Sequence, residues 1–328
     1  MSQLKKPPVI GGYFEFELLN KSNVGKTNNW FNSGRSAFAF LLGFHKVKLI
    51  QIPKYTCDVI LEPLNKMGIK YSFYSITKNL LPDYATGEID LKVPILINNY
   101  FGILDRQLES YKSNPLVIID NSQALYSNAT GGLGSFNSFR KFVGIPDGAA
   151  ARINKSYDIY IEDTWPTFKV TNQLSHLFGR IEEGPEAYYK AFENANDSFR
   201  FKQIECISEI SKRTFVKLDH ENNKNTRIKN FNYLHEKLGN INELSWQING
   251  EVVPLVYPLL ISNGSQLRKN LISNKIFTPT YWPNSQIEIP SNCYEEYLVK
   301  NLVALPIDQR YGVKEMDVIS KYVLDFDV

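Results

Sequence analysis

An aspartate and a lysine stand where their spacing could bring them into one catalytic site. Asp120 ends the apolar run Leu116–Ile119, so we expect it at the carboxyl edge of a parallel strand, where α/β sheets place ligands. Lys141 closes the segment Ser138–Lys141, and a serine three residues before a lysine lets one turn supply a phosphate ligand and an amine. Each also has an ordinary interpretation, a strand-end turn for Asp120 and a solvated side chain for Lys141. The pair is more specific than either residue alone.

The segment Asn32–Ala37 has the composition of a phosphate-binding helix start. Its small and hydroxylated residues precede the apolar helical run Phe38–Leu42. Residues of this kind leave backbone N–H groups exposed, and the helix dipole favours an anion at that end. The alternative is a structural serine N-cap with a glycine turn.

Other motifs indicate chemistry less strongly. The segment Asn20–Thr27 ends like a nucleotide-binding P-loop, but Asn20 stands where that loop needs its first glycine, so a P-loop NTPase is only a second alternative. Gly131–Gly134 is interpreted as a turn, because strand-like spacing resumes at Phe136. The four histidines and three cysteines have no metal-ligand spacing, and we expect neither a metal site nor a disulfide.

The region around Asp120 alternates between strand and helix patterns. Short β-rich runs predict parallel strands, and amphipathic stretches between them predict crossover helices. The expected strands are Val47–Ile50, Tyr71–Tyr74, Val93–Ile97 and Leu116–Ile119, and the expected helices are Cys57–Met67 and Leu104–Lys112. This alternation predicts an α/β domain.

Beyond Glu182 the pattern changes to longer polar helices and a few strand-like runs. Helices are expected over 204–218, where Ile204, Ile207 and Ile210 share one side, then over 222–238, 265–274 and from Lys314 onward, with strands near 252–261. We expect a large domain over residues 1–210 and a smaller α+β domain over 211–328. The N-terminal segment 1–30 is expected to pack on the small domain.

Composition excludes several classes of function. With 43% hydrophobic and 22% charged residues in a length of 328, the chain can bury a substantial core. A net charge of +3, spread over mixed acidic and basic residues, gives no basic patch for nucleic acid. Met1–Pro8 is basic but lacks the apolar stretch of a signal peptide, and no run is long enough to span a membrane. We therefore expect a cytoplasmic protein with neither nucleic acid nor a membrane as partner.

A set of motifs in a fixed order spans nearly the whole chain. It consists of Asn32–Ala37, Pro53–Cys57, Tyr100–Gly102, Ile119–Ala124, Ser138–Lys141, Asp147–Gly148, Tyr281–Pro283 and Leu305–Gly312. The set resembles the DegT/StrS family of sugar aminotransferases, which depend on pyridoxal 5'-phosphate (PLP). The resemblance implies fold type I of aspartate aminotransferase, with a large domain on a mostly parallel seven-stranded sheet, a small α+β C-terminal domain, and a homodimer with sites at the subunit interface.

The resemblance also implies a reaction. Family members transfer an amino group from L-glutamate to a keto sugar, usually nucleotide-linked, as in polysaccharide or glycoconjugate biosynthesis. Family dehydratases carry a histidine in place of the lysine, so Lys141 favours amino transfer. The alternative is a sugar-binding or partner protein of the same fold with weak or no transaminase activity.

Residue roles follow from the same resemblance. Lys141 is expected on the aldehyde carbon of PLP, Asp120 on the pyridine nitrogen and Gln123 near the 3-hydroxyl. A carboxylate beside the nitrogen keeps it protonated, and the lysine then acts as general base and acid. The remaining candidates are Gly34, Arg35, Ser36 and Ser138 for the phosphate, Tyr55 over the ring, and Tyr100, Tyr281, Trp282, Asn284 and Arg310 for the substrate. Core positions remain the alternative for Tyr55 and Trp282.

The sequence departs from the family pattern in three places. Many members have the serine five residues before the lysine and two glycines after the acidic residue, whereas here Ser138 stands at three and Ala149 replaces the second glycine. The family's Asn-x-Arg-Met segment, which reaches the phosphate of the partner subunit, has no clear match near Asn194–Ser211.

Overall fold

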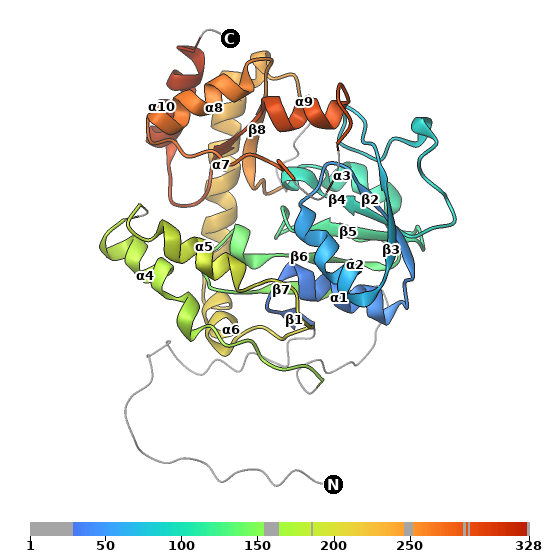
Figure 1. Cartoon of the computed structure of the whole chain (residues 1–328). Coiled ribbons are helices and arrows are strands. Elements are labelled where there is room, and N and C mark those ends of the chain that lie inside the picture. The colour runs from blue at the N-terminus through green and yellow to red at the C-terminus, as the bar shows by residue number, and fades with distance from the viewer. Residues whose placement is uncertain are drawn as a thin grey trace, which may run out of the picture.

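A seven-stranded sheet and a two-stranded sheet organise the part of the chain that the computed structural model describes (Figure 1). The described residues are 29–153, 164–184, 186–245, 252–284, 287 and 289–326. The P-loop-like segment Asn20–Thr27 lies outside them, as does nearly all of the N-terminal segment 1–30.

The large sheet has the strand order β1-β7-β6-β5-β4-β2-β3. Strands β6, β5, β4, β2 and β3 pair in parallel, whereas β7 is antiparallel to both of its neighbours. The bounds are β1 Trp30–Phe31, β2 Leu49–Pro53, β3 Lys70–Tyr74, β4 Ile95–Asn98, β5 Val117–Asn121, β6 Gly134–Asn137 and β7 Ala149–Arg152. The expected α/β fold with a mostly parallel seven-stranded sheet is confirmed.

Each face of the large sheet carries its own apolar core, because side chains alternate along every strand. On one face Ile118 packs in a core with residues of α1 (Gly34–Phe44) and α2 (Leu61–Met67). On the other face Val117 and Ile119 join a core that continues through α7 (His220–Leu238) to the small sheet. Asp120 follows Ile118 by two residues and therefore lies on the face that α1 covers.

The small sheet pairs β8 (Val256–Leu260) antiparallel with β9 (Leu302–Pro306). Helix α7 packs on α10 and β8, as Figure 1 shows. The remaining α-helices are α3 Asp105–Leu108, α4 Ser175–Glu182, α5 Tyr189–Asp197, α6 Glu209–Phe215, α8 Gly264–Ser273, α9 Tyr294–Asn301 and α10 Val313–Leu324. Short 3₁₀ helices cover Asp58–Ile60, Tyr84–Thr86, Tyr100–Gly102, Glu109–Tyr111, Phe139–Lys141, Thr171–Gln173 and Gly239–Ile241. A smaller α+β part is thus confirmed, and its boundary at residue 210 stays a prediction.

The prediction of one helix over 204–218 is wrong in its first part. Only α6 is helical, and its N-cap Ser208 accepts a hydrogen bond from the Ser211 amide (3.2 Å). Before it, Cys206 forms β-bridges with Phe31 and Thr167. The isoleucine spacing is compatible with a helical face, but pairing along β1 satisfies this segment's backbone groups in an extended form.

The predicted helix Cys57–Met67 is a 3₁₀ turn followed by α2, and α3 likewise continues into a 3₁₀ turn at Glu109. Neither α9 nor β9 was predicted. Within the described ranges, no helix is long and apolar enough to cross a membrane, and no group of His, Cys, Asp or Glu side chains could hold a metal ion.

Candidate active site

A cavity of about 300 Å³ opens at the carboxyl ends of β4, β5 and β6, beside the N-terminus of α1. Asn98 ends β4, Asp120 lies near the end of β5, and Ser138 directly follows β6. The lining residues are Ser33, Gly34, Arg35, Thr56, Cys57, Val59, Ile60, Asn98, Asn99, Asp120, Ser122, Gln123, Phe136, Ser138, Arg140, Lys141, Phe192, Asn196 and Trp282. The cavity therefore brings together the carboxylate, the amine and the helix start that the sequence singled out.

Asp120 is held in place by its own turn. Its Oδ1 atom accepts a hydrogen bond from the Ser122 amide (2.6 Å), and in the sheet it pairs with Asn98 and Phe136. Burial raises the pKa of the Asp120 carboxyl, while the charge of Lys141 and the hydrogen bond from Ser122 lower it in part. These partners do not fully offset the cost of burying the charged carboxylate, so a cation placed in the cavity would stabilise its charged form.

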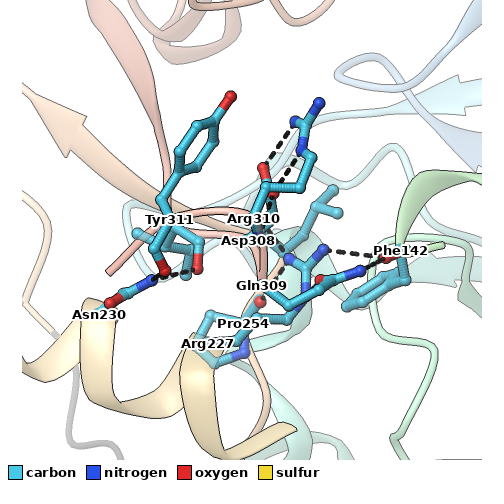
Figure 2. A network of polar contacts seen from close by, with 10 residues as sticks. Phe142, Arg227, Asn230, Pro254, Asp308, Gln309, Arg310 and Tyr311 are labelled. Carbon is cyan, nitrogen blue, oxygen red and sulfur yellow. Dashed lines mark hydrogen bonds and ion pairs between the residues drawn. The ribbon is translucent and has the colours of Figure 1, made fainter. Parts of the chain in front are cut away.

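Lys141 ends a 3₁₀ turn and its side chain is exposed to the cavity. The amine forms no hydrogen bond or ion pair with any residue in the described ranges, which leaves it available to a ligand. The backbone directly after it is fixed. Arg227 from α7, a fully buried side chain, donates to the carbonyl oxygen of Phe142 (3.2 Å), as Figure 2 shows. It also donates to the carbonyl oxygen of Leu255 (2.9 Å).

Two amides in the cavity wall have polar atoms without partners among the described residues. Gln123 Oε1 accepts from the Phe101 amide (2.9 Å), but its buried Nε2 donates to nothing. Asn98 Nδ2 donates to Thr56 Oγ1 (2.9 Å), while its Oδ1 is also buried and unpaired. Unmet hydrogen bonds of this kind cost stability, so they indicate a polar ligand at this wall.

The N-terminus of α1 faces the cavity with Ser33, Gly34 and the cationic Arg35. Ser33 is its N-cap and accepts from the Ser36 amide (3.4 Å), and no acidic residue lies in the first turn. A Cβ atom at Gly34 would lie 3.4 Å from Ser122 Oγ, an ordinary contact distance, so the helix start lies close to the strand end that carries Asp120. The backbone amides and dipole of this turn favour an anion.

Several residues proposed from the sequence do not line the cavity. Ser36 is buried and donates to Asn32 Oδ1 (2.7 Å). Tyr55 is fully buried, stacks on Tyr100 at 5.6 Å between ring centroids, and donates to the carbonyl oxygen of Tyr281 (3.0 Å). These three tyrosines form an aromatic layer behind Trp282, which does line the cavity and lies edge-on to Tyr55 at 4.9 Å.

The other two substrate candidates also lie outside the lining. Asn284 donates to the carbonyl oxygen of Thr56 (2.5 Å), so it supports a lining segment from behind. Arg310 is exposed and pairs with Asp308 (2.6 Å), as drawn in Figure 2.

Known structures share this architecture. A DegT DnrJ EryC1 StrS aminotransferase from Brucella abortus is 13% identical, with a TM-score of 0.60 over 91% of this chain and 85% of its own. The sugar aminotransferase CalS13 from Micromonospora echinospora is 13% identical, with a TM-score of 0.64 over 91% and 87%. The chain has the fold of these sugar aminotransferases.

A dehydratase has the same fold. The GDP-4-keto-6-deoxy-D-mannose-3-dehydratase from E. coli, solved with bound hydrated PLP, is 18% identical, with a TM-score of 0.61 over 89% of this chain and 86% of its own. No protein-family model matches the sequence, and no curated protein matches it. At these identities the structures establish the fold alone.

Sequence reasoning overlooked several residues of the cavity wall. One of them is the cationic Arg140. In the sequence it stands directly before Lys141, and two adjacent basic residues are typical of a solvated surface. Asn98 ends β4 and Cys57 lies shortly after β2, so both could have been found by the strand-end rule that identified Asp120. Phe192 and Asn196 reach the cavity from α5, a contact that no local pattern encodes.

Proposed function

We propose that this protein is a PLP-dependent aminotransferase that moves an amino group from L-glutamate to a keto sugar, nucleotide-linked in the simplest case, in polysaccharide or glycoconjugate biosynthesis. The observation that carries the proposal is the presence of Asp120 and Lys141 in one cavity at the carboxyl edge of a fold shared with sugar aminotransferases. A cytoplasmic homodimer remains part of the proposal.

The residues present fit PLP. The unpaired Gln123 Nε2 is a donor for the 3-hydroxyl oxygen, Asp120 is an acceptor for the protonated ring nitrogen, and the start of α1 with Ser138 suits the phosphate. When bound, the cofactor supplies an aldehyde that takes up amines and a ring that accepts electrons. No metal ion is needed for this chemistry.

The chain's own residues would do the rest. Asp120 would hold a proton at the ring nitrogen, because a cation beside it favours the carboxylate that burial otherwise disfavours. Lys141 would take the proton from the Cα atom of the amino donor as a general base and deliver it, as a general acid, to the former aldehyde carbon of the cofactor. In the second half-reaction it would carry a proton in the reverse direction, to the carbon of the keto sugar. The Lys141 amine forms no hydrogen bond with any described residue, and this supports its role as a proton carrier.

The keto sugar, the larger of the two proposed substrates, has one candidate contact among the described residues of the cavity wall. Trp282 is partly buried and offers an aromatic face suited to a sugar or a base. Tyr100, Tyr281 and Asn284 would act indirectly, by supporting Trp282 and Thr56, whereas Arg310 would meet only a substrate that extends beyond the cavity.

The test is spectroscopic. Purified protein loaded with PLP should show an absorbance band of the lysine-bound cofactor, L-glutamate should abolish that band, and a keto nucleotide sugar should restore it. A band that L-glutamate leaves unchanged would favour the alternative, a sugar-binding or partner protein without turnover. No band at all would reject PLP binding.

A further inference from the structure

Arg140 is a charged side chain that lines the cavity without an acidic partner among the described residues. Its Nη2 donates to Asn196 Oδ1 (2.8 Å), and its guanidinium lies 4.2 Å from the centroid of the Phe199 ring. Burial lowers the pKa of Arg140 to about 10, while Asp147 partly opposes this and Arg35 adds to it. A neutral amide and an aromatic ring do not balance a partly buried positive charge.

The acid whose charge acts on Arg140 is already engaged. Asp147 is fully buried and accepts hydrogen bonds from Ser208 Oγ (2.5 Å) and from the Ser208 amide (2.8 Å). A further hydrogen bond comes from Ser211 Oγ. These bonds hold the start of α6, so Asp147 influences Arg140 through its field rather than through an ion pair.

Arg35 gives the contrast within the same wall. It forms an ion pair with Glu62 (3.0 Å) and donates to the carbonyl oxygen of Phe199 (2.9 Å), so its charge is balanced inside the protein. Phe199 thus fixes both arginines, one through its carbonyl group and the other through its ring. Of these two arginines, Arg140 is the one whose charge no acidic residue in the described ranges pairs, so its charge is left for a ligand.

We propose that Arg140 binds the phosphate group of the cofactor, an inference that rests on the proposed function. In PLP the arm that carries the phosphate and the aldehyde are attached to adjacent ring carbons. On the other side of the carbon that carries the aldehyde, the next ring carbon carries the 3-hydroxyl, for which Gln123 Nε2 is the unpaired donor. A cation one residue before the lysine, in the same wall as the α1 amides, is therefore matched to the phosphate.

This assignment gives the chain a strong phosphate ligand of its own. The Asn-x-Arg-Met segment of the family has no clear match here, and Arg140 supplies from within one chain the kind of contact that segment brings from a partner subunit. Arginine suits the task because its planar fork can donate two hydrogen bonds to one phosphate.

The experiment compares PLP with pyridoxal, which lacks the phosphate. Both would be titrated by absorbance into apo wild type, Arg140→Gln, Arg140→Lys and a control, Arg152→Gln. The exposed Arg152 side chain donates hydrogen bonds to Asn128 and does not line the cavity. Arg140→Gln should weaken PLP binding about 30- to 100-fold, the effect of losing a charge-assisted contact, and leave pyridoxal binding within about twofold. Arg140→Lys should keep most of the preference for PLP, and the control should keep all of it.

Three results would overturn the inference. Equal loss of PLP and pyridoxal binding in Arg140→Gln would mean that the residue only shapes the cavity. Unchanged PLP binding with a raised KM for L-glutamate would assign Arg140 to the donor carboxylate instead. Arg140→Lys could also lose the preference for PLP as fully as Arg140→Gln, while thermal denaturation shows that both variants are folded. That result would mean that the positive charge of residue 140 does not determine phosphate binding. If wild type binds neither compound, the proposed function itself fails.

Discussion

The Nε2 atom of Gln309 lies 2.8 Å from the carbonyl oxygen of Phe142, the residue after Lys141. Gln309 also accepts from Arg227 Nε (3.1 Å), and the Arg227 guanidinium lies 4.7 Å from the centroid of the Phe142 ring (Figure 2). Two side chains from the C-terminal half therefore fix the backbone that carries the candidate lysine. The segment Leu305–Gly312 acts at the site through this contact rather than by lining the cavity.

Gln309→Ala should loosen that support. We expect the free energy of unfolding to fall by about 1–2 kcal/mol, because a buried carbonyl loses a donor and Arg227 loses an acceptor. The rate of the L-glutamate half-reaction should fall with it, while Gln266→Ala on the exposed side of α8 changes neither quantity. Urea denaturation and single-turnover kinetics measure the two effects. Wild-type stability in Gln309→Ala would contradict the account of this contact.

Asp120→Asn should fold and bind PLP but lose at least two orders of magnitude in rate, since misplacing a charge partner at a reacting centre costs about 3 kcal/mol. Asparagine can still accept from the Ser122 amide, but it cannot keep the ring nitrogen protonated. The rate should be compared with that of Asp317→Asn, an exposed carboxylate that contacts Tyr233. Near wild-type turnover would mean that Asp120 is a strand-end turn residue.

The same substitution should change the pH dependence of stability in the apo protein. The folded-state pKa of Asp120 is raised, mainly by burial, so its protonated form is favoured in the fold. The stability that Asp120 contributes is present below its ordinary pKa and is lost as the pH rises through the raised value. Apo Asp120→Asn should therefore gain Tm over wild type at neutral pH, and the difference should shrink toward acid pH. A difference that does not depend on pH would count against a buried carboxyl here.

Trp282→Ala tests the substrate side of the cavity. Only the large substrate would touch this indole, so the KM for a keto nucleotide sugar should rise while the L-glutamate half-reaction stays nearly unchanged. Trp282→Phe keeps an aromatic face and should have an intermediate KM. Equal losses in both half-reactions, or loss of folding, would instead assign Trp282 to the packing against Tyr55 and Tyr100.

Sequence patterns were sufficient where the structure is set by short-range rules. Short β-rich runs that alternate with amphipathic stretches predicted the parallel sheet, and the rule that ligands lie at the carboxyl ends of parallel strands placed Asp120 at its edge. The start of α1 was likewise readable from Ser33 and the apolar run behind it.

Long-range packing was beyond such patterns. Cys206 pairs with Phe31 at the edge of the sheet. The isoleucines near it, whose spacing predicted a helix, therefore lie partly in an extended segment. Tyr55 lies in the core because Tyr100 and Tyr281, distant in sequence, cover it. Arg140 could not be told from a solvated arginine without the fold, since Asn196 and Phe199 come from a different part of the chain.

The most direct measurement is the location of the covalent cofactor. Protein incubated with PLP, reduced with borohydride and digested should yield one pyridoxyl-modified peptide, with the label on Lys141, and Lys141→Ala should yield none. L-glutamate added before the reductant should remove the label from wild type, because the amino donor displaces the lysine. A label on any other lysine, or an unlabelled protein, would contradict the assignment of Lys141 and with it the proposed reaction.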